Sequence, residues 1–318
     1  MRHQADEGLA TPRAGDEPGG FPATTDVPSP KQGGTGVLTF GDAATMPPAP
    51  VKLTEQRMRH LEYLPDTALD WLETTAGSIR AVSARGRLHR FSGEVRQDSF
   101  ALAQDEDALV LIVADGVGGE SAGHIGAALA ARTAANSRAL IARALAHGAD
   151  PGSIMLSELS AAIEAVGLDR GIPAQAMSTT FTMAVVSPPA SATGATTAAI
   201  IQLGDSPVWR IRDSAWTRLD AVPEAEADSV LSTSTLALPL HIEASIWSET
   251  LSPGDTLALT SDGVGNIIPQ NADYAEALGR LWSGSAPAPS DLLSVVDATV
   301  RTFEDDRTFV GIRLADRA

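Results

Sequence analysis

The sequence has no cysteine among its 318 residues. This absence excludes disulfide bonds, zinc–thiolate sites and cysteine nucleophiles. There is no apolar run long enough to span a membrane, and no apolar segment of a signal peptide follows the N-terminus, so insertion and export are not expected. Basic residues are few: the chain has 23 lysines and arginines against 40 aspartates and glutamates, which gives a formal net charge of −17. Such a chain repels nucleic acids and anionic membranes, and a cytoplasmic location fits these absences.

Composition divides the chain into three parts. The first 50 residues contain eight prolines and eight glycines, which is typical of disorder when no period accompanies it, so we predict a disordered tail over residues 1–50. Within it, residues 36–41 (GVLTFG) could dock as a short strand, although a flexible apolar segment is the simpler interpretation. Scattered leucines and a tryptophan, interrupted by Pro65, predict a helical lead-in over residues 51–77, and the folded domain is predicted over residues 78–318.

The most apolar stretch of the domain runs directly into an acid. Residues 109–113 (LVLIV) lack polar alternation, which predicts a strand buried on both faces, and Asp115 and Gly116 follow it. Glycine after the acid allows a backbone to approach a ligand closely. A second strand, residues 256–260, leads in the same way into Asp262 and Gly263. Two carboxylates delivered to one place predict a site for a hard cation.

Short strands interrupted by pairs of helices predict an α+β domain rather than an alternating α/β one. We predict helices over residues 121–147, 153–166, 274–282 and 292–303. We predict strands over residues 78–83, 99–103, 109–114, 180–186, 197–203, 208–211, 245–251, 256–260 and 308–314.

Acids recur where these strands begin or end. Acids gathered at one end of a sheet raise one another's pKa and destabilise the fold unless a cation neutralises them. With oxygen ligands and no cysteine, the choice narrows to magnesium, manganese or calcium. The segments concerned are residues 97–99 (QDS), 115–116 (DG), 204–206 (GDS), 262–263 (DG) and 305–308 (DDRT).

The ordered set of motifs resembles the metal-dependent type 2C protein serine/threonine phosphatases over roughly residues 78–315. It comprises QDS, DGVGG, STTFTMAVV (178–186), LGDSPVWRIR (203–212), LSPGDTLALTSDGVG (251–265) and DDRTFVGIRL (305–314). Any one motif is weak, but six in order are specific. The resemblance implies a four-layer α-β-β-α sandwich of two antiparallel sheets flanked by helices.

The resemblance also implies a binuclear metal site and its chemistry. Two Mn²⁺ or Mg²⁺ ions would be held by Asp98, Asp115, the carbonyl of Gly116, Asp262 and Asp305. Asp115 would bridge the ions, Asp306 would support its neighbour, and Asp205 would be mainly structural. Ions about 3.5 to 4 Å apart can activate a shared water. The expected reaction is hydrolysis of phosphoserine or phosphothreonine in a protein, a target of a serine/threonine kinase, by a protein that we expect to be monomeric.

Two departures from the family pattern leave alternatives open. Relatives carry an arginine before the first acidic motif that grips phosphate, whereas residues 86–98 (GRLHRFSGEVRQD) resemble a bacterial branch with Gly-x-x-His ahead of Gln-Asp. His89 or Arg90 could therefore contact phosphate, and His89 could equally hydrogen-bond within its turn. Gln175 stands where relatives with a third metal have an aspartate. A catalytically weak or inactive module that binds phosphoproteins is thus the alternative function.

Overall fold

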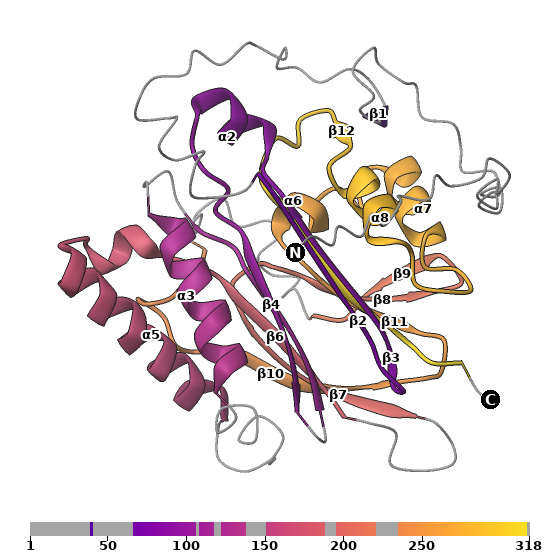
Figure 1. The fold of residues 1–318 in the computed structure, drawn as a ribbon, viewed down its shortest axis with the longest axis horizontal. Helices are drawn as coiled ribbons and strands as arrows, with labels where there is room; N and C mark the ends of the chain where they lie inside the picture. Colours follow the sequence, from indigo (N-terminus) through magenta and orange to yellow (C-terminus); the bar gives the residue numbers. More distant parts are fainter. Residues whose placement is uncertain are drawn as a thin grey trace, which may run out of the picture.

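The computed structural model describes residues 39–40, 66–105, 108–117, 122–137, 151–187, 195–220 and 235–316. In these parts of the chain, two antiparallel sheets pack face to face, and helices cover the outer face of each sheet (Figure 1). The predicted four-layer α-β-β-α sandwich is confirmed.

One sheet has five described strands in the order β10-β7-β6-β5-β4. Their bounds are β4 (Ser99–Asp105), β5 (Ala108–Ala114), β6 (Phe181–Val186), β7 (Thr196–Leu203) and β10 (Ser245–Leu251). Every residue of β5 is buried, because the strand lies between β4 and β6 and both its faces meet a core. Val110 and Ile112 pack toward the helices, whereas Leu109 and Leu111 pack between the sheets.

The second sheet has six described strands in the order β2-β3-β13-β11-β8-β9. Their bounds are β2 (Thr67–Glu73), β3 (Gly77–Ala84), β8 (Val208–Arg212), β9 (Ala215–Arg218), β11 (Thr256–Thr260) and β13 (Arg307–Leu314). Leu257, Leu259 and Val310 of this sheet meet Leu111 of the other in the core between the sheets. That core fixes the two sheets, and therefore their ends, relative to one another.

The outer layers are pairs of helices. The helices α3 (Gly123–Asn136) and α5 (Pro151–Arg170) cover the five-stranded sheet, and α7 (Ala272–Arg280) and α8 (Pro289–Val296) cover the six-stranded one (Figure 1). Shorter elements are α2 (Arg87–Ser92), the 3-10 helix η1 (Ala174–Met177) and α6 (Asp262–Gly265). Among the described helices, none combines the length and the apolar character needed to cross a membrane.

The helical lead-in is wrong where the structure describes it. Residues Thr67–Glu73 form β2, which pairs antiparallel with β3 and extends the sheet. The apolar residues of this segment do not form a buried helix face, because Leu72 packs against the core between the sheets while Leu69 and Trp71 are exposed. Residues 51–65 lie outside the described parts of the chain.

The last predicted helix is too long. The helix α8 ends at Val296, and β12 (Thr299–Val300) follows where the prediction extended the helix to residue 303. The guanidinium of Arg307 donates to the carbonyls of Val296, Ala298 and Phe303, so these carbonyls are bound by a side chain instead of by helix N–H groups. All the strands predicted within the domain are present, with bounds that shift by one or two residues.

Parts of three predictions fall on residues that the structure does not describe. Of the predicted tail, only residues 39–40 are described, and they form β1 (Thr39–Phe40), paired in parallel with β12. The predicted 121–147 helix is described from Gly123 to Asn136 as α3, and residues 138–147 lie outside. Gly118 and Gly119 of the DGVGG motif also lie outside.

Candidate metal centre

Asp98 and Asp115 lie at the same end of the five-stranded sheet. Asp98 immediately precedes β4 and Asp115 immediately follows β5, and the antiparallel register pairs Ser99 with Ala114. The two acids are therefore brought together by strand pairing, although 17 positions separate them in the printed sequence.

Asp262 and Asp305 lie at one end of the other sheet for the same reason. Asp262 follows β11 after Ser261, and Asp305 precedes β13 by two positions, while the register pairs Thr260 with Phe309. Backbone contacts are very close here. A Cβ atom on Gly263 would lie 1.9 Å from the carbonyl oxygen of Asp306, so a larger residue would push the two motifs apart.

The pKa values of these carboxyl groups show that the two sheet ends form one cluster. Burial, followed by the charges of Asp98, Asp262 and Asp305, holds the pKa of Asp115 well above its usual range. Burial, reinforced by the charges of Asp305 and Asp205, raises the pKa of Asp262 to about 6. Burial and then the charge of Asp306 raise the pKa of Asp98 to about 7. Burial also raises the pKa of Asp305.

The donor set fits a hard divalent cation. Asp98 is 2% exposed, and the Thr308 hydroxyl donates to its Oδ2 at 2.7 Å. The other oxygen, Oδ1, is buried without a hydrogen-bond partner in the described parts of the chain. There, too, no ion pair engages Asp98, Asp115, Asp262 or Asp305. A buried carboxylate oxygen without a donor, among other carboxylates, is what Mg²⁺ or Mn²⁺ would satisfy.

The STT and GDS motifs support the Asp115 strand end. The backbone N–H of Asp115 donates to the Thr180 hydroxyl oxygen at 3.1 Å, and the N–H of Thr180 donates to the Asp115 carbonyl at 2.8 Å. The hydroxyls of Thr180 and Ser206 are 2.8 Å apart. Asp205 accepts a hydrogen bond from Thr235 at 3.1 Å, and its charge acts on Asp115 and Asp262. These motifs therefore hold the Asp115 strand end in place through hydrogen bonds.

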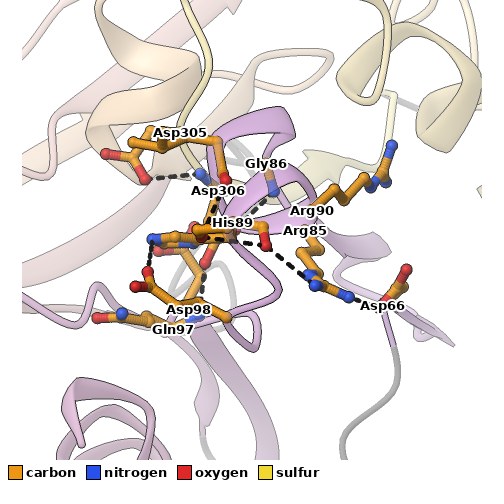
Figure 2. A network of polar contacts seen from close by, with 12 residues as sticks. Asp66, Arg85, Gly86, His89, Arg90, Gln97, Asp98, Asp305 and Asp306 are labelled. Atoms are coloured by element: carbon orange, nitrogen blue, oxygen red, sulfur yellow. Dashed lines mark hydrogen bonds and ion pairs between the residues drawn. The ribbon is translucent and has the colours of Figure 1, made fainter. Parts of the chain in front are cut away.

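His89 faces Asp306 rather than open space. Its Nδ1 lies 2.9 Å from Oδ1 of Asp306, and its Nε2 lies 3.7 Å from a Glu94 oxygen (Figure 2). Burial alone would lower the pKa of His89, but the hydrogen bond and charge of Asp306 outweigh it and raise the pKa. One ligand atom each of His89, Asp305 and Asp306 lies within 4.8 Å of the others. Both Asp306 oxygens already accept backbone hydrogen bonds, so this trio is a poorer ion site than the four-acid cluster.

The two arginines near the first motif have different surroundings. Arg90 is paired with Asp297 at 3.0 Å, and its side chain points away from Asp98 and Asp305 (Figure 2). Arg96 donates to the carbonyl of Ser83 at 3.1 Å, and its Nε is buried without a partner among the described residues. Burial lowers the pKa of Arg96, and the charges of Asp98 and Asp306 oppose this, so Arg96 lies within the field of the acids.

Several supporting residues have no sequence signal strong enough to identify them. The Thr308 hydroxyl donates to Asp98 and lies 2.7 Å from the Ser83 hydroxyl, from which it can accept. The Ser261 hydroxyl accepts from the backbone N–H of Thr308. Each partner is distant in sequence, and serine and threonine are common on strands. The one available signal is position, because Ser261 and Thr308 each lie within three residues of an aspartate in the cluster.

The described chain is thus a sandwich of two antiparallel sheets with a carboxylate cluster at one end. The model of one family, described as protein phosphatase 2C, matches residues 85–296, which is more than half of the chain. The chain belongs to the protein phosphatase 2C family. The match ends before Asp305 and Asp306, so the geometry described above is what connects these two residues to the site. Among curated protein sequences, none matches the chain.

Solved structures share the fold at low sequence identity. PppA, a key regulatory component of T6SS in Pseudomonas aeruginosa, is 21% identical with a TM-score of 0.50, over 74% of this chain and 96% of that one. The S. agalactiae serine/threonine phosphatase is 17% identical with a TM-score of 0.53, over 78% and 99%. RsbX in complex with magnesium is 12% identical with a TM-score of 0.50, over 78% and 100%.

Proposed function

We propose that the protein is a metal-dependent phosphomonoester hydrolase that removes phosphate from phosphoserine or phosphothreonine in proteins. The observation that carries this proposal is the four-acid cluster, in which a buried oxygen of Asp98 has no donor among the described residues. Family membership supports the same role. We further propose that it acts as a cytoplasmic monomer on a target of a serine/threonine kinase.

Asp98, Asp115, Asp262, Asp305 and the carbonyl of Gly116 would hold two Mn²⁺ or Mg²⁺ ions. Bound ions would supply an activated water and charge stabilisation for the phosphoryl group. Asp115 would be the central residue of this set, because the charges of the three other acids all act on it. The protein's own contribution is to fix these carboxylates in place before substrate arrives, which the hydrogen bonds of Thr180 and Thr308 support.

We propose that Arg96 contacts the substrate phosphate, in place of Arg90. Arg96 has a donor without a partner in the described parts of the chain, and its charge is felt by Asp98. A guanidinium donates in a planar fork that suits phosphate oxygens. Arg90, in contrast, already donates to both oxygens of Asp297.

The test is hydrolysis of p-nitrophenyl phosphate and of a phosphothreonine peptide by the full chain, with Mn²⁺ and after exhaustive chelation. We expect turnover with Mn²⁺ and none without it. Activity that survives chelation would refute the proposal. Tight phosphopeptide binding with no phosphate release in Mn²⁺ would instead favour the alternative, a phosphoprotein-binding module, which the commitment of Arg90 to Asp297 supports.

A further inference from the structure

We propose that Asp306 is a positioning residue for the metal centre, which fixes Asp98 and Asp305 relative to one another. This inference rests on the proposed function, because it concerns the same carboxylates. It assigns to Asp306 a role that acts through its neighbours, with no direct contact to an ion or substrate.

Two backbone N–H donors and the imidazole of His89 converge on the Asp306 carboxylate from the segment that precedes β4. The N–H of Gly86 and the Nδ1 of His89 lie 2.6 Å and 2.9 Å from Oδ1, and the N–H of Gln97 lies 2.5 Å from Oδ2 (Figure 2). Asp306 itself is 2% exposed. Its carboxylate therefore binds both ends of the loop that contains α2.

These contacts lie one or two residues from Asp98 and Asp305, the two carboxylates that we propose to bind metal. Gln97 is the residue directly before Asp98, so the bond to its N–H holds the backbone on which Asp98 is carried. On the other side, the backbone N–H of Asp306 donates to Oδ1 of Asp305 at 2.8 Å. One residue thus fixes Asp98 with its side chain and Asp305 with its main chain.

The close packing of this junction leaves little freedom for compensation. A Cβ atom on Gly86 would lie 2.2 Å from the carbonyl carbon of Asp305, so the two segments touch backbone to backbone. An asparagine at position 306 would fit the space but offer one oxygen in place of two. Its amide NH₂ would face the N–H of either Gly86 or Gln97, and that backbone donor would be left without an acceptor.

Asp255 provides a matched control on the same sheet. It is 1% exposed and accepts from Nε and Nη2 of Arg212, each at 2.6 Å, and from the N–H of Ser252 at 2.8 Å. It directly precedes β11, whereas the acid cluster follows the other end of that strand. Asp255→Asn therefore perturbs a buried, fully bonded aspartate without touching the cluster.

The experiment is Mn²⁺ titration by calorimetry of the full chain, comparing wild type, Asp306→Asn and Asp255→Asn, with thermal unfolding of each. We expect Asp306→Asn to bind Mn²⁺ about 10 to 100-fold more weakly, the range found for outer-shell partners of metal ligands. Asp255→Asn should lower the unfolding temperature but leave Mn²⁺ affinity within about 2-fold. Saturating Mn²⁺ should restore the kcat of Asp306→Asn on p-nitrophenyl phosphate.

Three outcomes would overturn the inference. Unchanged Mn²⁺ affinity in Asp306→Asn would remove the positioning role, and equal weakening in both variants would reduce it to general stability. Loss of one bound ion with unchanged affinity for the other would make Asp306 a ligand. A protein that binds Mn²⁺ as expected but hydrolyses nothing would refute the proposed function and leave the positioning role standing.

A second pair of variants keeps the inference testable if Asp306→Asn does not fold. His89→Asn retains a donor near the place of Nδ1, whereas His89→Ala removes it and leaves the carboxylate intact. We expect His89→Ala to weaken Mn²⁺ binding several-fold and His89→Asn to recover most of the affinity. Equal affinities in the two variants would contradict the inference.

Discussion

The two ends of strand β11 carry aspartates in opposite situations. Asp255, just before the strand, accepts three hydrogen bonds, two of them from the guanidinium of Arg212. Asp262, just after the strand, is surrounded by Asp115, Asp305 and Asp205. The first end is a completed ion pair. The second is a concentration of like charge in which no acid forms an ion pair within the described parts of the chain. The difference separates an aspartate that is paired within the fold from one that we propose to be a metal ligand.

The clustered carboxylates at the second end destabilise the fold. Carboxylates whose pKa is raised by burial and by one another must either take up protons or repel. A divalent cation removes both penalties at once. Strand pairing and the core between the sheets hold the strand ends together against this repulsion.

The largest expected effect comes from removing one acid of the cluster. Asp115→Asn and Asp262→Asn should each lower kcat/KM for p-nitrophenyl phosphate by more than about 100-fold, since outer-shell partners alone cost about 10 to 100-fold. The same variants should be more stable than wild type when metal-free, because a repelling charge is gone. Steady-state kinetics in Mn²⁺ and urea unfolding in chelator measure the two effects. A metal-free variant less stable than wild type would contradict the contrast.

The pH dependence of stability should differ with and without metal. The ordinary pKa of these acids is 3.8, and burial raises the pKa of Asp98 to about 7 and of Asp262 to about 6. Because the folded pKa values are raised, their contribution to stability is fully present below about pH 4 and is lost as the pH rises through about 6 to 7. Metal-free protein should therefore lose on the order of a few kcal/mol across this window. Thermal unfolding from pH 4.5 to 7.5 checks this, and saturating Mn²⁺ should abolish the slope.

A substitution of Asp255 should have the opposite effects, lowering stability while leaving activity nearly unchanged. Asp255→Asn replaces a carboxylate that accepts from Arg212 and Ser252, so the free energy of unfolding should fall by about 1 to 3 kcal/mol. Turnover in Mn²⁺ should change by less than about 2-fold, since the site lies beyond the other end of β11. Urea unfolding and p-nitrophenyl phosphate kinetics on one preparation provide both numbers. A large loss of activity with little loss of stability in Asp255→Asn would contradict the structural role assigned to Asp255.

The sequence predicts the acids of the cluster better than it predicts the residues that hold them in place. Asp115 and Asp262 are identifiable because an apolar strand ends directly in Asp-Gly, a local signal. The bonds from Asp306 to Gly86 and Gln97 span more than 200 positions, and local patterns carry no trace of such pairing. The same limit explains why β2 was expected to be helical, since the segment is a strand through its pairing with β3 and not through a local pattern. The sequence therefore identifies the acids at strand ends, such as Asp115 and Asp262. It does not identify the distant contacts by which Asp306 holds their neighbours in place.

The smallest effect is expected at Arg90, which one interpretation of the sequence placed on the phosphate. Its ion pair with Asp297 is more than one third exposed on both sides, and exposed pairs contribute about 0 to 1 kcal/mol. Arg90→Ala should therefore change KM for p-nitrophenyl phosphate by less than about 2-fold, whereas Arg96→Ala should raise it by about 10-fold through loss of a charged hydrogen bond. Kinetics of the two variants at saturating Mn²⁺ decide between them. A larger effect on KM for Arg90→Ala than for Arg96→Ala would instead make Arg90 the phosphate contact. The ion pair of Arg90 with Asp297 would then have to break when substrate binds.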